Sequence, residues 1–111
     1  MNRMNDRKAW RDVGAIDDIR PLGARVVVAK DHDIAVFRTA SDDVFAVHDR
    51  CPHKGGRLSQ GIVHGRSVTC PLHNWIICLT DGRAAAPDEG YTPSVPVRVE
   101  GRRILLAVDH S

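Results

Sequence analysis

The chain has 111 residues, of which 42% are apolar, 27% charged and 5% aromatic. This length is typical of a single domain with one modest core, and the apolar share argues against a disordered chain. Lysine and arginine exceed aspartate and glutamate by only 16 to 14, with both signs mixed, so the basic stripe of a nucleic-acid or membrane-surface binder is missing.

Taken in chain order, the residues predict a domain made of strands. Residues 1–8 are expected to form a flexible tail, and residues 9–111 a single domain. Residues 12–19 are compatible with a short turn of helix. After them, short β-branched runs recur between turn residues, at 25–30, 33–39, 44–48, 67–70, 75–80, 95–100 and 103–108.

The last two runs carry the clearest strand pattern. Val95, Val97 and Val99 alternate with other residues, which predicts one buried and one solvated face. Pro96 cannot donate a hydrogen bond, so this strand is expected at a sheet edge, or to begin there. The whole pattern predicts an all-β sandwich or barrel.

The N-terminal residues contain no apolar stretch of the kind that export signals have. No run reaches the roughly 18 apolar residues of a membrane helix. We therefore expect a cytoplasmic protein without a membrane partner.

The three cysteines are Cys51, Cys70 and Cys78. An odd number in a short chain without an export signal favours metal binding over a disulfide framework. Cys78 is expected to be a buried or half-buried thiol with no ligand role.

Two of these cysteines stand next to histidines in proline-bounded loops. Cys51 and His53 are followed by sixteen residues and then by Cys70 and His73. Two thiolates and two imidazoles form a four-ligand site for zinc or for an iron–sulfur cluster. Each loop contributes one cysteine and one histidine, which suits a two-iron centre. Zinc modules more often pair cysteine with cysteine and histidine with histidine.

The ligand spacing resembles the Rieske [2Fe–2S] signature. Residues 51–75 read CPHKGGRLSQGIVHGRSVTCPLHNW and resemble the small subunit of assimilatory NAD(P)H-dependent nitrite reductase. Residues 88–90 and 95–102 fit the same family, so the resemblance covers about residues 9 to 108. It implies an antiparallel Rieske-type sandwich or barrel, with a two-loop cluster-binding region at residues 50–76.

The resemblance also implies a role for each ligand. Cys51 and Cys70 would bind the inner iron and His53 and His73 the outer iron of one [2Fe–2S] cluster. Imidazole ligands leave the cluster less negative than four thiolates would, which places such centres at about −150 to +300 mV, against about −400 mV for plant-type ferredoxins. The loops lack the additional cysteines of high-potential relatives, so we expect the low end of this range.

Further residues are expected around the cluster. Gly55 and Gly56 would let backbone N–H groups approach the bridging sulfides, since glycine has no Cβ in the way. Lys54 is expected beside the cluster with them. Asn74 and Trp75 would flank the second histidine. Hydrophobic side chains would limit water, namely those of Leu58, Leu72 and Trp75, with Pro87 in a third covering loop.

The loop region also carries an excess of positive charge. From residue 49 to 66 the charged residues are Asp49, Arg50, Lys54, Arg57 and Arg66. If exposed, they would guide docking to an acidic partner surface. Arg57 stands where the resembled family has proline. The remaining histidines lack ligand spacing and are expected at the surface or in turns: His32, His48, His64 and His110.

Two functions follow from the resemblance. The first is a redox subunit, partnered by a large nitrite reductase subunit with flavin, sirohaem and a [4Fe–4S] cluster, which would itself reduce nitrite to ammonium in nitrogen assimilation. The second is a freestanding Rieske ferredoxin that feeds an aromatic-ring dioxygenase. Such ferredoxins usually have glycine after the second histidine, where this chain has Asn74. A zinc-stabilised binding module, or a purely structural subunit, also stays open.

Overall fold

The computed structural model describes residues 8–29, 32–52, 56–72 and 74–109. They form ten strands in three antiparallel sheets, with two short 3₁₀ helices. The prediction of an all-β fold is confirmed. In the described part of the chain, no helix is long and apolar enough to cross a membrane.

The first sheet joins the two ends of the described chain. Strand β10 (Arg103–Asp109) lies between β1 (Lys8–Ala15) and β9 (Val97–Glu100). Strand β1 begins inside the segment expected as a tail and covers the first half of the segment considered for a helix, of which only η2 (Ile16–Asp18) is helical. The sequence pattern missed β1 because its residues lack a clear alternation.

The second sheet has the order β2, β3, β4, β8. Its strands are β2 (Ala24–Val28), β3 (Asp33–Arg38), β4 (Val44–His48) and β8 (Ser94–Val95). Pro96 separates β8 from β9, and both are edge strands, as its missing amide hydrogen predicts. The expected alternation nearby is only partly right, because Val97 is half-buried but Val99 is exposed.

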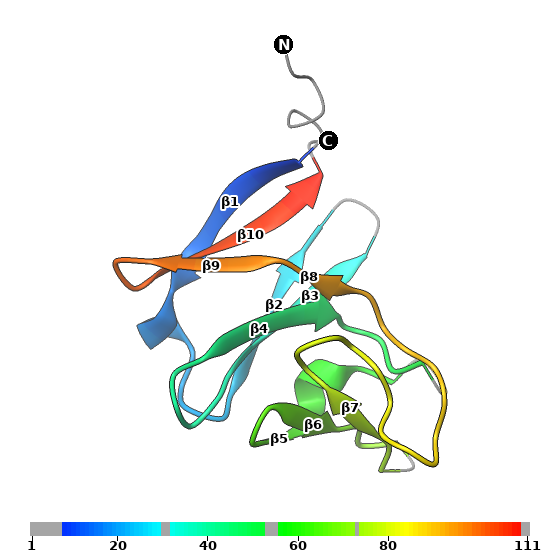
Figure 1. The fold of residues 1–111 in the computed structure, drawn as a ribbon. Helices are drawn as coiled ribbons and strands as arrows, with labels where there is room; N and C mark the ends of the chain where they lie inside the picture. The colour runs from blue at the N-terminus through cyan, green and yellow to red at the C-terminus, as the bar shows by residue number, and fades with distance from the viewer. Residues whose placement is uncertain (1–7, 30–31, 53–55, 73, 110–111) are drawn as a thin grey trace.

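The third sheet is small and stands at the opposite end from the ends of β1 and β10 (Figure 1). It consists of β5 (Ile62–His64), β6 (Ser67–Thr69) and β7 (Ile76–Cys78) in that order. The helix η3 (Leu58–Gln60) precedes it. Neither strand β5 nor helix η3 was predicted, because each is only three residues long.

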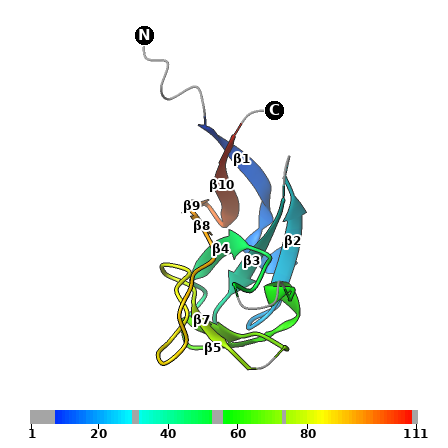
Figure 2. The same cartoon turned by 90° about the vertical axis from the view of Figure 1, so that its right-hand side faces the viewer.

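Strand β3 is buried on both faces and divides the interior into two cores. Ile34 and Val36 face a core shared with the first sheet, whereas Ala35 and Phe37 face a core shared with the third. Both views show the second sheet between the other two (Figures 1 and 2). The third sheet is thus held against a continuous apolar layer, which fixes the loops at its end.

Candidate metal centre

The two loops that carry the predicted ligands leave strands of two different sheets. Cys51 lies in the loop after β4, and Cys70 directly follows β6. Both are free cysteines with side chains 2% and 0% exposed. They belong to one buried cluster, although 19 positions separate them in sequence. The packing of the second sheet on the third therefore brings the two thiols together.

Each loop is closed by the same kind of main-chain hydrogen bond. The amide of Cys51 donates to the carbonyl of Gly56 at 2.8 Å, and that of Cys70 to the carbonyl of Trp75 at 2.7 Å. In both loops the bond joins the cysteine to the residue five positions later. Two tight loops of equal size thus present one thiol each, as a centre bound from two sides requires.

Burial raises the pKa of the Cys70 thiol, and the adjacent Cys51 raises it further, while a hydrogen bond from the backbone of Leu72 lowers it. Two neighbouring thiolates in an apolar site repel each other and lack hydration. A bound cation removes both penalties and deprotonates a coordinating thiol. The donor pair therefore fits a metal centre.

Gly56 gives a second test of fit. A Cβ atom at this position would lie 3.3 Å from the Cys70 sulfur and 2.9 Å from a methyl group of Leu72. The space beside the Cys70 sulfur is thus open only because residue 56 has no side chain. This agrees with the expectation that a glycine lets the loop backbone approach a bound cluster.

Hydrophobic groups surround the thiol pair unevenly. Leu58 is fully buried and Trp75 half-buried in the same core, but Leu72 is 44% exposed. A third loop lies beside the two ligand loops: Gly90, at φ +128°, packs against Pro52 and the Trp75 ring. Pro87 itself is exposed, so Gly90 rather than Pro87 makes the contact that was expected of this loop.

Several predicted site residues fall outside the described part of the chain, namely His53, Lys54, Gly55 and His73. Asn74 is described: it is exposed and has φ +56°, in the left-handed region. Cys78 is half-buried on β7, on the opposite face from the buried Ile77, and its sulfur lies 2.9 Å from the Thr80 hydroxyl. Cys78 therefore does not face the thiol pair.

Two of the charged residues expected along the rim, Asp49 and Arg57, are paired within this chain. Asp49 is buried, and its carboxylate accepts hydrogen bonds from the amide and hydroxyl of Ser59 at 2.7 and 2.8 Å. Arg57 is paired with both Asp49 and Asp33. No local pattern reveals this arrangement, because its members come from three separate segments of the chain.

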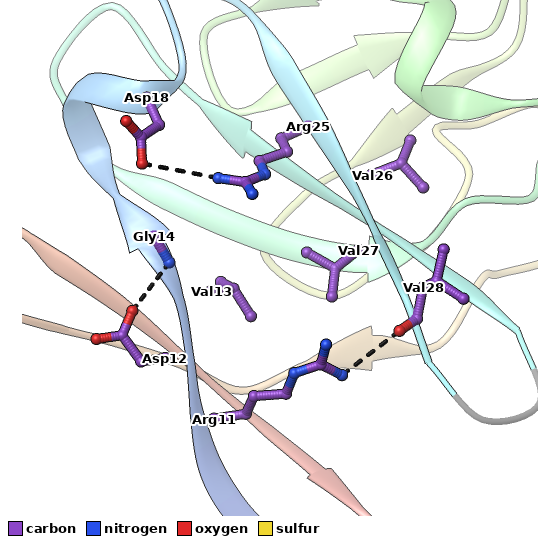
Figure 3. A pocket seen from close by; sticks show the side chains of 9 residues that line it. All are labelled: Arg11, Asp12, Val13, Gly14, Asp18, Arg25, Val26, Val27 and Val28. Carbon is purple, nitrogen blue, oxygen red and sulfur yellow. Dashed lines mark hydrogen bonds and ion pairs between the residues drawn. The ribbon is translucent and has the colours of Figure 1, made fainter.

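A hollow of about 390 Å³ lies between β1 and β2 (Figure 3). Its charged side chains already have partners. Arg25 faces Asp18 at 3.7 Å, Arg11 donates to the carbonyl of Val28, and Asp12 is bound by Arg103. We assign no site to it.

Comparison with known proteins identifies the fold. The family model of the Rieske [2Fe–2S] domain matches residues 9–104. The chain belongs to this family. It is therefore a Rieske electron-transfer protein, a redox component of oxidoreductases, and it binds one [2Fe–2S] cluster per chain.

Two functional groups among the relatives of this Rieske domain match it over most of their own length, dioxygenase ferredoxins and nitrite reductase small subunits. The domain is 42% identical over 96 residues to the anthranilate 1,2-dioxygenase ferredoxin subunit of Burkholderia cepacia, across 86% of this chain and 84% of that protein. The ferredoxin of carbazole 1,9a-dioxygenase from Nocardioides aromaticivorans superposes with a TM-score of 0.80 at 25% identity, covering 89% and 97% of the two chains.

The second group is represented by a Mycobacterium tuberculosis protein assigned as an NADH-dependent nitrite reductase small subunit. This structure superposes with a TM-score of 0.82 at 29% identity, covering 96% of this chain and all of the other. The predicted Rieske-type fold and the resemblance to nitrite reductase small subunits are thus confirmed, while the two groups share one architecture.

Proposed function

We propose that this Rieske protein is a ferredoxin that delivers single electrons to the oxygenase component of an aromatic-ring dioxygenase. The observation that carries the proposal is the 42% identity to an anthranilate 1,2-dioxygenase ferredoxin subunit over most of both chains. Because 84% of that relative is covered, the two proteins are of similar length. This reverses the order of the two functions that the sequence motifs favoured.

We further propose that Cys51 and Cys70 bind one iron of the cluster as thiolates, and that His53 and His73 bind the other. The buried, adjacent thiols support the first half of this assignment. The matching ligand spacing in the sequence supports the second half. Bound in this way, the cluster accepts and releases one electron at a time.

The residues around the thiols serve this role by excluding water and holding the loops in place. Leu58 is completely buried beside the cysteines, and the hydrogen bonds from the amides of Cys51 and Cys70 close both loops. A preformed site needs little rearrangement when its charge changes, which favours electron transfer. The exposed Leu72 places an apolar group at the surface next to Cys70, where a partner protein would approach.

The identity of residue 74 does not decide between the two functions. Asn74 adopts φ +56°, a conformation that glycine takes freely and that asparagine tolerates better than most other residues. Asparagine and glycine are therefore equivalent for the loop backbone here. The presence of Asn74 in place of the usual ferredoxin glycine therefore does not favour a nitrite reductase subunit.

A second candidate function is the small subunit of an NAD(P)H-dependent nitrite reductase. The superposition with the Mycobacterium tuberculosis structure, at a TM-score of 0.82 over all of that chain, favours it. In that case the large subunit, with its flavin, sirohaem and [4Fe–4S] cluster, would carry out the reduction of nitrite.

The test is to supply the reduced, cluster-loaded protein to each of the two kinds of partner. We expect it to support product formation by a purified anthranilate dioxygenase oxygenase that lacks its own ferredoxin. It should leave nitrite-dependent oxidation of NAD(P)H by a nitrite reductase large subunit unchanged. Stimulation of the large subunit alone would overturn the proposal in favour of the second candidate.

A Cys51→Ser variant serves as the control for electron delivery. Oxygenase turnover that persists with this variant would show that the electrons bypass the proposed ligands.

A further inference from the structure

The first cluster-binding loop is tied at its base by a buried carboxylate. Asp49 lies two residues before Cys51, and its side chain has 0% exposure. It accepts hydrogen bonds from the amide and hydroxyl of Ser59, on the far side of the loop. The residues that enter the loop and those that leave it are thus joined through the side chain of Asp49.

Arg57 adds a charge to this tie. Its Nη2 atom lies 3.0 Å from the Asp49 carboxylate and 2.8 Å from that of Asp33 on β3. The two carboxylates raise the pKa of Arg57, through the hydrogen bond to Asp33 first, so the guanidinium stays charged. Arg57 therefore bridges a buried and a partly exposed negative charge.

The residues of this charge group flank the loop that carries Cys51. Arg57 directly follows Gly56, whose carbonyl binds the amide of Cys51 and whose Cα is adjacent to the Cys70 sulfur. Asp49 is shielded from water, so its charge acts through a medium that screens it poorly. Adding an electron near an uncompensated buried carboxylate is unfavourable, and a neighbouring cation offsets that effect.

We propose that Arg57 is a positioning residue that holds Asp49 at the base of the cluster-binding loop and compensates its charge, so that this ion pair sets the reduction potential of the cluster. The inference rests on the proposed ligation by Cys51 and Cys70. It holds whether the electron acceptor is an oxygenase or a nitrite reductase subunit.

The experiment measures the midpoint potential of the full, cluster-loaded chain by spectroelectrochemistry. Removing the cation in Arg57→Gln should shift the potential down, and removing the buried anion in Asp49→Asn should shift it up. The double variant should return close to the wild-type value, since the two charge changes cancel. Arg57→Lys keeps the charge and should restore most of the shift lost in Arg57→Gln.

Arg102→Gln is the matched control. Arg102 pairs with Asp17 through two hydrogen bonds at the turn between β9 and β10, and it is exposed. This substitution removes the same charge in the same kind of pair, away from the cysteines, and should leave the potential unchanged.

If the ion pair between Asp49 and Arg57 had only a structural role, removing it would lower the stability of the protein and leave the reduction potential of the cluster unchanged. Wild-type potentials in cluster-loaded Arg57→Gln and Asp49→Asn would therefore overturn the proposal. If these variants lose the cluster, Asp33→Asn decides, because it leaves the Asp49 contacts intact. Asp33→Asn should raise the potential, and an unchanged value would count against the proposal.

Failure of the underlying assignment would look different. A Cys51→Ser variant that keeps its cluster would contradict the ligands themselves. Failure to reduce an oxygenase would contradict only the proposed partner.

Discussion

Gly56 and Cys70 lie side by side across the two cluster-binding loops, and a Cβ atom at residue 56 would be tightly packed against the Cys70 sulfur. A Cβ there would approach the Cys70 sulfur to 3.3 Å. The two loops come from opposite sides of the site, so this contact sets how closely their backbones approach each other. A side chain at residue 56 requires the Leu72 side chain to move and the Cys70 sulfur to shift by a few tenths of an ångström.

Gly56→Ala is therefore expected to reduce the amount of bound cluster and to lower the free energy of unfolding by about 1–3 kcal/mol, the usual range for overpacking. Iron and sulfide analysis and chemical denaturation measure the two effects. Gly65→Asn is the control, because residue 65 has φ +58° and a Cβ there would meet no atom within 4 Å. Full cluster content in Gly56→Ala would contradict this prediction and show that the loops accommodate a methyl group at residue 56.

Cys51→Ser is expected to abolish the visible chromophore and the EPR signal of the reduced cluster, since serine does not replace a thiolate on iron. Cys78→Ser should keep both, because Cys78 lies on the outer face of β7 and contacts Thr80. The measurement is iron content together with low-temperature EPR after dithionite reduction. Equal losses in the two variants would contradict the ligand assignment.

Ile77→Ala tests the core that supports the metal centre. Ile77 is 0% exposed and belongs to the cluster of buried residues around both cysteines, so its truncation should cost about 2–5 kcal/mol of unfolding free energy. Ile62, on β5 of the same sheet, is 71% exposed, and Ile62→Ala should cost less than about 0.5 kcal/mol. Similar costs in urea denaturation would mean that the third sheet does not pack as described.

His48 makes stability depend on pH. Burial lowers the pKa of His48 below its ordinary 6.5, and the charge of His32, whose ring stacks at 3.8 Å, lowers it further. Below pH 6.5 the unfolded chain takes up a proton that the folded chain binds less readily, so the folded state loses stability as the pH falls. Above that range both states are neutral at this residue.

We therefore expect the wild type to lose more stability than His48→Gln when the pH is lowered from neutral toward about 5. Denaturation midpoints at several pH values measure this difference. Parallel curves for the two proteins would assign the pH dependence to other groups.

Local sequence patterns predicted most of the central and C-terminal strands, and failed where an element depends on its partners. The run at 33–39 became β3 because its residues are apolar on both faces. Strand β1 went unnoticed because what stabilises it is its pairing with β10, nearly a hundred residues away. The edge position of the strands around Pro96 could be predicted, because proline lacks an amide hydrogen whatever the fold.

Three features of the centre could be predicted from the residues alone: the type and spacing of the candidate ligands, the glycines in the first ligand loop, and a chain with the composition of a β domain. These are properties of single residues and short segments, so they need no coordinates. The placement of Cys51 beside Cys70, of Gly90 against Pro52, and of Asp49 between Ser59 and Arg57 came from the folded chain. Those contacts depend on how three sheets pack on one another, and no local pattern encodes them.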